Sequence, residues 1–578
     1  DVKREAESAD HKAKRIADSK AAGLIWPSMK YEIAENCMTC HGLANPDLKA
    51  DDLAKMLGAG HPINPEFELV KYSQGSVRHR HYPPNMKTNA EMTPKEQAEF
   101  FVIGQAAALV SATSVMSKSS EAKYIAAQKT RAENAKAALS GVSEAADPTG
   151  DKTFALDIRG ISMSNNFTWV LICAFVIWFM QVGFVLLGGL LPAKNALNYM
   201  THCFIATTLG VIIYWFVGFG IMFGGFEFLG QHIGHGNKFM GLSGFMLLGD
   251  AYDVRVVLLF IFQAVVATFI GSIIAGAVAE RMKLCSYILM FFFVYIFIYP
   301  VYGHWVWGEG WLWELPYGAG MRDFAGSGVV HAVGGTIGFV GAAFLGPRAG
   351  RYNEDGSSNS IPGHNVGYMI VGTILLAFGW LFYDAGSTLA AGDLRMSVVA
   401  ANTCLAGSIG AVTVLFLTYL LSGHTDVGEA CNGALAGFVA ISAGCAYVAP
   451  WAAVVIGFLA AVLYLISFWI IGNKFKVDDP LGACSVHGAN GFWGLIALGI
   501  FADGSYGGVY GVITGHYGQL VSQAIGAGVA FAFAGGMAFI IFKLIGGKNS
   551  KSKMRVSEEV EKDGLDIHIH GTACYPEQ

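Results

Sequence analysis

The chain carries little charge for its length. Of its 578 residues, 14% are Asp, Glu, Lys or Arg, whereas 53% are hydrophobic and 73 are glycine. This composition is too apolar and too rich in glycine for an ordinary soluble multidomain protein, and it indicates a polytopic membrane protein. The formal net charge of −5 is small. Because the charged residues gather in the first 160 and the last 30 positions, nothing in the pattern indicates nucleic-acid binding.

Cysteine is also scarce, with ten in the whole chain. Most of them fall singly in apolar runs, where a small, soft side chain is most simply a packing residue. These are Cys173, Cys203, Cys285, Cys404, Cys431, Cys445 and Cys484. Only Cys37 and Cys40 form a motif.

That motif is Cys37-Met38-Thr39-Cys40-His41, a C-x-x-C-H sequence. It is typical of covalent c-type haem attachment, with two thioether bonds to the porphyrin and His41 as the proximal iron ligand. A zinc knuckle would need a second Cys/His pair at zinc spacing, which the following residues do not supply. A thioredoxin-like pair would need a βαβ context, which is absent. The motif therefore predicts one covalent haem c.

Residues 24–116 resemble a small single-haem cytochrome c, with a helix before the motif and a closing helix after a Pro-rich turn. Thr93-Pro94-Lys95-Glu96 predicts a capping box at the start of that closing helix. In such cytochromes the sixth iron ligand is usually a Met near the Pro-rich turn, which favours Met86. Met92 lies just before the cap, where packing explains it without iron. His79 and His81 are further candidates, and a His81 ligand would imply a much lower reduction potential.

Two charged segments flank this haem domain. Residues 1–23 predict a charged N-terminal helix, and residues 117–160 predict a polar helical tether that ends at Asp147-Pro148-Thr149-Gly150. We expect neither segment to carry chemistry. No signal peptide is visible, yet haem c is attached outside the cytoplasm, so we expect residue 1 to be a mature terminus left by cleavage.

From Phe167 onward, length and hydropathy predict about eleven membrane spans, in residues 161–547. Their expected centres are Ala174, Val211, Thr268, Phe293, Gly335, Thr373, Val412, Gly437, Leu459, Gly491 and Phe531. An odd number of spans puts the two termini on opposite sides. The loops that would then face the cytoplasm hold Lys194, Arg281, Lys283, Arg348, Arg351, Lys474, Lys476 and the tail KNSKSKMR. This excess of positive charge predicts a bacterial cytoplasmic membrane protein with a periplasmic haem domain and a cytoplasmic C-terminus.

The spans contain an internal repeat. Residues 323–338, DFAGSGVVHAVGGTIG, align without gaps with residues 479–494, DPLGACSVHGANGFWG, and place His331 opposite His487. An ionisable residue at membrane depth is a candidate functional residue, and a weak repeat puts its site between the two halves. We therefore expect His331 and His487 to face each other along a path. The alternative is that each His is buried and bonded to a neighbouring helix.

The region from about Asn166 to the C-terminus resembles the ammonium transporters of the Amt/Rh family. The resemblance rests on MQVGFVLLGGLLPAKN, FQ followed by GAVAERM, YPVYGHWVWG, DFAGSGVVH, GWLFYDAGS, EACNGALAGFVAISAGC, VDDPLGACSVHG and EEVEKDGLDIHIHGTACY. It implies an all-α membrane protein with two inverted five-helix halves and an eleventh helix. It also implies a homotrimer with one pore per subunit, and a transporter of ammonium rather than an enzyme.

Residue by residue, the resemblance implies an outer ammonium site at Trp307 and Ser387, a structural carboxylate at Asp323, and twin pore histidines at His331 and His487. The chemistry of these residues suits those roles. A cation over the face of an indole gains about 0.5 to 2 kcal/mol. Imidazole donates, accepts and titrates near neutrality, as a proton relay requires. Asp323 begins a half-helix, and we interpret it chiefly as an N-cap.

The chain departs from the family at the gate below the outer site. The two Phe positions of the family fall on Val266 and Tyr383, and Asp384 stands where Asn is common. These changes predict a wider, more polar and anionic upper pore, unless Asp384 pairs with an Arg or caps a broken helix. Two functions remain, transport coupled to a haem domain for electron transfer, or an ammonium receptor with little flux. The twin His pair favours transport.

Residues 548–578 resemble the family's cytoplasmic tail, which takes part in regulation by PII-type proteins in relatives. The matching positions are Glu558, Glu559, Gly564, Leu565, Asp566 and Gly571. A PII-type regulator at this tail and a periplasmic redox partner for the haem are therefore the expected protein partners.

Overall fold

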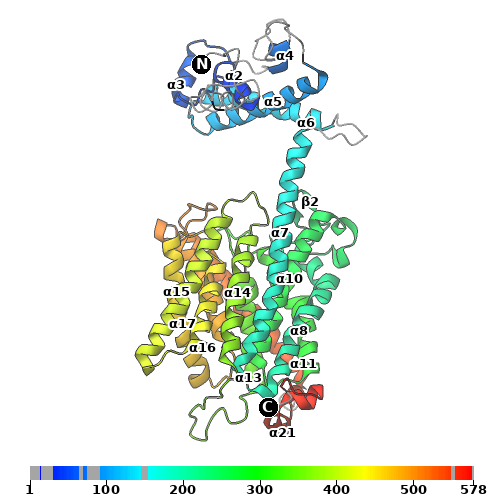
Figure 1. Ribbon diagram of the computed structural model, residues 1–578, viewed down its shortest axis with the longest axis vertical. Helices are drawn as coiled ribbons and strands as arrows, with labels where there is room; N and C mark the ends of the chain where they lie inside the picture. Colours follow the sequence, from blue (N-terminus) through cyan, green and yellow to red (C-terminus); the bar gives the residue numbers. More distant parts are fainter. Residues whose placement is uncertain are drawn as a thin grey trace. The chain divides into compact units, whose positions relative to one another are not determined.

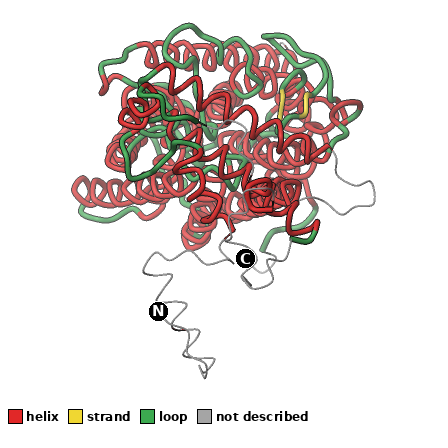
Figure 2. The backbone as a smooth tube through the Cα atoms, turned by 90° about the horizontal axis from the view of Figure 1, so that it is seen from above, coloured by secondary structure: helices red, strands yellow, loops and turns green. Residues whose placement is uncertain are grey.

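The computed structural model describes residues 30–63, 69–74, 92–144, 154–547 and 553–575, together with residue 14. This described part is helical, and its paired strands are only two residues long, β1 (Glu227–Phe228) and β2 (Gln231–His232) (Figure 2). The chain divides into two compact units, Asp1–Met163 and Ser164–Gln578. The rest of the N-terminal helix and the candidate iron ligands Met86, His79 and His81 lie outside the described residues.

The described part of the first unit is built from helices. They are α2 (Lys30–His41), α3 (Ala50–Gly58), α4 (Leu69–Gln74), α5 (Pro94–Met116) and α6 (Ala122–Glu144). The C-x-x-C-H motif forms the C-terminal end of α2. The predicted capping box of α5 is confirmed, because Glu96 N donates to Thr93 Oγ1 at 3.3 Å and Thr93 N donates to Glu96 Oε2 at 2.8 Å.

Helix α6 differs from the predicted solvated tether. Tyr124 and Gln128 are buried, and both donate hydrogen bonds to backbone carbonyls that follow the C-x-x-C-H motif. The sequence suggested solvent exposure because the helix lacks large apolar residues. Its buried face instead consists of polar side chains and alanines, and the polar groups there are satisfied by carbonyl oxygens.

The second unit begins within α7 and contains the long apolar helices, which run side by side along one direction (Figure 1). Its helices are α7 (Phe154–Leu186), α8 (Ala196–Ile213), α9 (Phe219–Phe223), α10 (Val254–Val278), α11 (Leu284–Phe293), α12 (Tyr299–Val306), α13 (Val333–Leu345), α14 (Val366–Gly386), α15 (Met396–Ser422), α16 (Val427–Ser442), α17 (Pro450–Trp469), α18 (Asn490–Phe501), α19 (Gly518–Gly546) and α21 (Glu558–Asp563). Wider π-helical segments are η3 (Tyr214–Gly218), η6 (Val294–Ile298), η7 (Ser327–Ala332), η8 (Ile470–Lys474), η9 (Cys484–Ala489) and η12 (Asp566–His570). Short 3-10 turns are η1 (Leu187–Leu190), η2 (Ala193–Asn195), η4 (Phe245–Leu247), η5 (Gly249–Ala251) and η10 (Val512–Thr514).

Within the described residues, 11 helices are long and apolar enough to cross a membrane. Ten of them contain predicted span centres, from Ser162–Leu190 to Gly518–Gly546. The predicted span centred on Gly437 is α16, which has 16 residues and is buried along almost its whole length. The remaining apolar helix is α5 of the first unit, where Phe100 and Ala107 belong to that unit's own core. The prediction of about eleven spans in the second unit is thus confirmed, with α16 shorter than expected.

The internal repeat is visible in the backbone. Gly326 and Gly482 occupy equivalent positions and have φ of 105° and 74°, a left-handed conformation that favours glycine. Further along, a Cβ on Gly335 would come within 2.2 Å of Gly488 N. A Cβ on Gly491 would come within 2.4 Å of Ser327 O. The two half-helices therefore cross with backbone against backbone, as their small-residue composition predicts.

The C-terminal tail docks on one end of the second unit. Val556 N donates to Arg281 O at 3.0 Å, and the Asp566 carboxylate accepts from Leu197 N and Asn198 N at 2.9 and 2.8 Å. Asp566 thereby caps the start of α8, where an acidic group is favourable. Lys194, one of the basic residues assigned to the cytoplasmic loops, donates to Glu561 O at 3.0 Å. The tail and these basic loops thus share one end of the bundle.

A buried ion cluster lies at the same end. Arg348 contacts Glu280 and binds Asp478, with Nε 2.7 Å from Asp478 Oδ2. Arg281 Nη2 donates to Asp478 O at 2.6 Å. Burial alone would raise the pKa of Asp478, but the hydrogen bond and charge of Arg348 outweigh it and lower the pKa to about 2. Asp478 directly precedes the half-helix that carries His487, so this cluster anchors that half-helix.

Replacing Asp478 by Asn should destabilise the protein by about 3 kcal/mol at pH 7, because it removes one of the two carboxylates that pair with the buried Arg348. A carboxylate with a lowered pKa contributes stability above its unfolded pKa and loses it as the pH falls towards about 2. The wild-type cluster should therefore persist from pH 7 to pH 4. Thermal unfolding in detergent measures both effects. Asp393→Asn, which breaks the more exposed pair with Arg395, is the control and should cost less than about 1 kcal/mol. Equal losses in the two variants would contradict the assignment.

Candidate functional site

His331 and His487 face each other inside the second unit. Both are buried, and their Nδ1 atoms lie 3.1 Å apart. The ring centroids are 5.1 Å apart and the planes are inclined by 22°. Each ring projects from a π-helical segment, η7 or η9, in which the wider turn shifts the side chains relative to a regular helix. The structure therefore brings together the two residues that the repeat paired.

The contact between the two imidazoles constrains their protons. One Nδ1 must donate and the other must accept, so the rings share one proton at this point. His331 Nε2 is buried and has no hydrogen-bond partner among the described residues. A ring that takes up a proton at its other nitrogen can thus pass the shared proton to its partner. The partner can then release a proton from its own second nitrogen.

Aromatic side chains hold the pair in place. The Trp380 ring stacks on His331 at 5.2 Å with an interplanar angle of 23°, and Phe184 lies 6.4 Å from His487. Trp380 Nε1 donates to Ser442 Oγ at 3.0 Å, which fixes the indole. Sequence reasoning missed Trp380, although it lies one helical turn before Tyr383 and so shares its face of α14.

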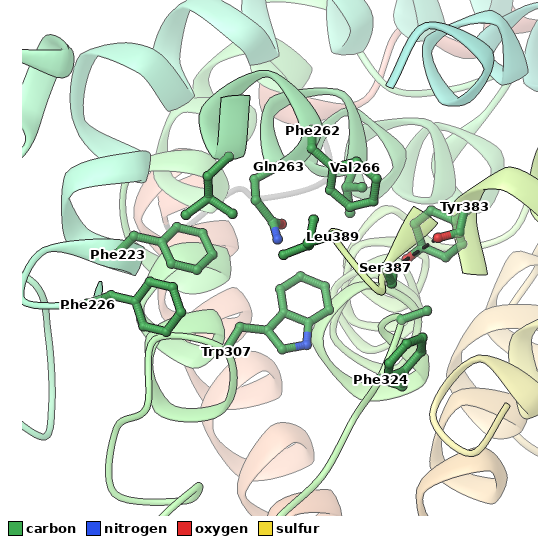
Figure 3. A pocket seen from close by; sticks show the side chains of 12 residues that line it. Phe223, Phe226, Phe262, Gln263, Val266, Trp307, Phe324, Tyr383, Ser387 and Leu389 are labelled. Atoms are coloured by element: carbon green, nitrogen blue, oxygen red, sulfur yellow. Dashed lines mark hydrogen bonds between the residues drawn. The ribbon is translucent and has the colours of Figure 1, made fainter. Parts of the chain in front are cut away.

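A cavity of about 110 Å³ is lined by Tyr383, whose ring centroid lies 6.3 Å from that of His331 (Figure 3). The predicted residues Trp307, Ser387, Val266 and Tyr383 all line it. Lining residues that the sequence did not single out are Phe223, Phe226, Leu259, Phe262, Gln263, Phe324, Ala325 and Leu389. Three segments that are distant in sequence, α10, the end of α12 and the end of α14, therefore place these four residues around one space.

Two buried polar groups in this lining lack a hydrogen-bond partner within the described part of the chain. They are Gln263 Oε1 and Tyr383 Oη. Figure 3 shows the Gln263 amide extending toward Trp307. A Cβ on Gly326 would lie 2.8 Å from Tyr383 Oη and 3.2 Å from Trp307 Cη2, so the hydroxyl and the indole edge meet near one point. Such groups are costly to bury unless a ligand or water satisfies them.

The outer-site residues are oriented by bonds to the backbone. Trp307 Nε1 donates to Asp323 O at 2.7 Å, and Ser387 Oγ donates to Tyr383 O at 2.9 Å. The Ser387 oxygen can therefore accept a hydrogen bond from a ligand. The Asp323 carboxylate accepts from the amides of Gly326, Gly328 and Val329 at 2.8 to 3.1 Å, in agreement with its interpretation as an N-cap.

Asp384 does not line the cavity. Its side chain is fully buried, and Oδ2 lies 2.6 Å from Thr403 Oγ1, which donates to it. No arginine pairs with it in the described structure. Asp384 points away because it follows Tyr383 by one residue, a step of about 100° around a helix. Within the described residues Asp384 thus neither makes the cavity lining anionic, as the sequence predicted, nor pairs with an arginine, the alternative.

A smaller cavity, of about 20 Å³, lies against His487. Tyr199, Ser272 and Asn432 line it together with apolar side chains such as Phe184. The Asn432 amide donates to Tyr464 Oη at 3.0 Å. His487 thus lines the smaller cavity, whereas the larger cavity reaches the pair through Tyr383, whose ring centroid lies 6.3 Å from that of His331.

The first unit presents the haem motif on one helix. Cys37 and Cys40 are free thiols three residues apart, and so they lie on the same face of α2, with Cys40 exposed. His41 ends the helix. This donor set fits covalent attachment of haem c. Met92 is buried with Ala34, Met38, Leu69 and Phe100, as the packing interpretation predicts.

A model of the Ammonium Transporter Family matches residues 168–575, which include every residue of the path. The chain belongs to this family. It is 43% identical over 449 residues to ammonium transporter Amt2 of Archaeoglobus fulgidus, covering 75% of this chain and 92% of that protein. It is 36% identical over 451 residues to ammonium transporter 1 member 3 of Solanum lycopersicum, covering 72% and 94%.

Solved structures of family members share the fold of the second unit. A structure titled Sensor Amt Protein has 33% identity and a TM-score of 0.65, covering 71% of this chain and 99% of that one. Mep2 of Saccharomyces cerevisiae has 27% identity and a TM-score of 0.60, covering 68% and 88%. The family match begins at residue 168 and leaves the first unit outside it. Because the relatives are named as transporters, the comparison supports the expectation that the chain is not an enzyme.

Proposed function

We propose that the second unit transports ammonium across a membrane and that the first unit carries one haem c for electron transfer. The observation that carries the transport proposal is the contact of His331 and His487 at 3.1 Å, with one cavity against His487 and another lined by Tyr383, the ring next to His331. A relay of two imidazoles in an apolar wall suits a substrate that can lose and regain a proton.

The outer cavity provides ligands that match ammonium. The cation has four N–H donors, and the cavity offers the face of Trp307 and three oxygens, Ser387 Oγ, Gln263 Oε1 and Tyr383 Oη. The indole face contributes about 0.5 to 2 kcal/mol. The oxygens replace hydrogen bonds that the cation loses with its water shell. A cation bound here is thus partly dehydrated before it moves inward.

Beyond this site the cation must lose its proton. Moving a bare charge through an apolar wall is far more costly than moving neutral ammonia. His331 Nε2, which is buried and unpaired within the described residues, can accept the proton, and the shared Nδ1 position passes a proton on to His487. Ammonia and the proton then rejoin at the inner cavity.

In the first unit, Cys37 and Cys40 would form the thioether bonds and His41 would bind the iron. The group supplies one-electron chemistry when bound. We propose Met86 as the sixth ligand, with His81 and Met92 as the alternatives. The electron donor or acceptor is then a periplasmic redox partner. Redox titration of the haem with His81→Ala and Met86→Ala distinguishes these two candidates.

The proposal includes the protein's location and partners. We propose a homotrimer in a bacterial cytoplasmic membrane, with the haem domain in the periplasm and the C-terminal tail in the cytoplasm. A PII-type regulator would bind at this tail. Protease accessibility of the tail in right-side-out vesicles tests the orientation, and native mass spectrometry tests the trimer. Co-purification with a PII-type protein tests the regulator.

An ammonium receptor with little flux is the second candidate. A specific finding favours it, because the chain is 33% identical to a protein whose structure is titled Sensor Amt Protein. Val266 and Tyr383, in place of the family's two Phe residues, point the same way. In that case the haem domain or the tail reports the bound cation.

Ammonium flux into proteoliposomes separates the two functions. A transporter should give flux well above protein-free liposomes, and the double change Val266→Phe with Tyr383→Phe should slow it or leave it unchanged, because a tighter gate hinders entry. A receptor should give no wild-type flux and gain some in the double variant. Ile374→Phe, on the exposed side of α14, is the control and should leave the rate unchanged. Absence of flux in the wild type would overturn the transport proposal.

A further inference from the structure

Helix α6 carries a buried cation that the transport and haem-attachment proposals do not use. Arg131 is 2% exposed, and its guanidinium donates to Gly42 O at 2.6 Å, Gln128 Oε1 at 2.7 Å and Ala108 O at 3.0 Å, and to Ser111 Oγ. Its Nε has no partner among the described residues, and no carboxylate there acts on it. Burial lowers the pKa of Arg131 to about 10, so the side chain stays charged at neutral pH.

This cation lies at the C-terminal end of the haem-motif helix. Gly42 directly follows His41, and the chain turns there, with Gly42 N donating to Met38 O at 3.1 Å and Leu43 at φ 46°. The last carbonyls of a helix carry a partial negative charge, which a nearby cation offsets. A Cβ on Gly42 would come within 2.5 Å of Arg131 Nη1, so glycine permits the close contact.

Tyr124 and Gln128 complete this arrangement. Tyr124 Oη donates to Leu43 O at 2.7 Å, and Gln128 Nε2 donates to Gly42 O at 3.0 Å. Three residues at helical spacing on α6 thus hold the two carbonyls that follow His41. Of the three, only Arg131 is charged. No anion among the described residues neutralises this charge.

We propose that Arg131 is a positioning residue for the haem, which fixes the backbone after His41 and raises the reduction potential of the iron. The inference rests on the proposed attachment of haem c to this motif. Reduction lowers the charge of the iron by one, so a fixed positive charge nearby favours the reduced state. The effect is large where burial limits screening by water. Burial and hydrogen bonding around the ligand are established means of tuning a haem potential.

Redox titration of the full-length protein in detergent, followed by the haem absorption bands, tests the inference. Arg131→Gln should lower the midpoint potential. Gln128→Glu should also lower it, because the new carboxylate neutralises Arg131 at nearly the same side-chain volume, while Arg131 still donates to Gly42 O in place of the lost Gln128 Nε2 bond. Lys129→Gln removes the same formal charge from an exposed position on α6 and should leave the potential close to that of the wild type.

Each outcome decides a different point. If the wild type holds no haem that survives acid-acetone extraction, the haem assignment is wrong and the inference fails with it. If haem is attached but Gln128→Glu and Arg131→Gln keep the wild-type potential, the inference alone is wrong. If Arg131→Gln does not fold, Gln128→Glu decides, and a shift no larger than that of Lys129→Gln overturns the role of Arg131.

Discussion

Replacing His487 by leucine should lower the ammonium-driven current of proteoliposomes by more than about tenfold. The change removes one half of a pair whose Nδ1 atoms are 3.1 Å apart, and leaves the other imidazole buried without that partner. Loss of a buried hydrogen-bond partner costs about 1 to 3 kcal/mol, and 1.4 kcal/mol corresponds to a factor of ten. His331→Leu should have a similar effect. Solid-supported membrane electrophysiology measures the current.

His202 provides a matched control for this experiment. It is fully buried in α8 and stacks on Tyr287 with ring centroids 4.3 Å apart, but it lines neither cavity. His202→Leu should therefore keep the wild-type current. A wild-type current in His487→Leu, or an equal loss in His202→Leu, would show that the pair is not the proton path.

The two half-helices could be predicted because the repeated residues are ones that the backbone conformation of each half-helix requires. Gly326 and Gly482 repeat because each has a positive φ, and Asp323 and Asp479 repeat because each accepts from amides at the start of its half-helix. Constraints of this kind act within a few residues, so one sequence shows them directly. The pairing of the two histidines followed from the repeat alone.

The cavity lining could be predicted only in part. Gln263 and Phe262 stand in the quoted FQ motif, but nothing local distinguishes a residue that faces a cavity from one that faces another helix. Asp384 shows the same limit, because its direction depends on the rotation of α14 against α15, where Thr403 donates to it. Helix rotation is set by packing among distant segments, which one sequence does not record.

Helix α6 shows a different limit. Its buried face contains Gln128 and Arg131, so hydropathy alone predicts a solvated tether. The face is stable because the carbonyls of Gly42 and Leu43 and of Ala108 accept its donors. These carbonyls belong to other parts of the chain, at the end of α2 and in α5. The residue pattern within α6 therefore does not indicate that they will accept its hydrogen bonds.

Replacing both Cys37 and Cys40 by alanine should remove all covalently bound haem from the purified protein. In a C-x-x-C-H motif the thioether bonds form at the two cysteine thiols, which here are free and lie on one face of α2 next to His41. Haem staining of a denaturing gel and the pyridine haemochrome spectrum after acid-acetone extraction measure the result. Cys285→Ala removes an exposed free thiol from the second unit and should leave the haem in place.

His41→Ala should retain thioether-bound haem in part but lose the proximal ligand, which turns the spectrum high-spin. If the double alanine variant still holds covalent haem, the C-x-x-C-H motif is not the attachment site. The charge of Arg131 would then act on the helix end alone.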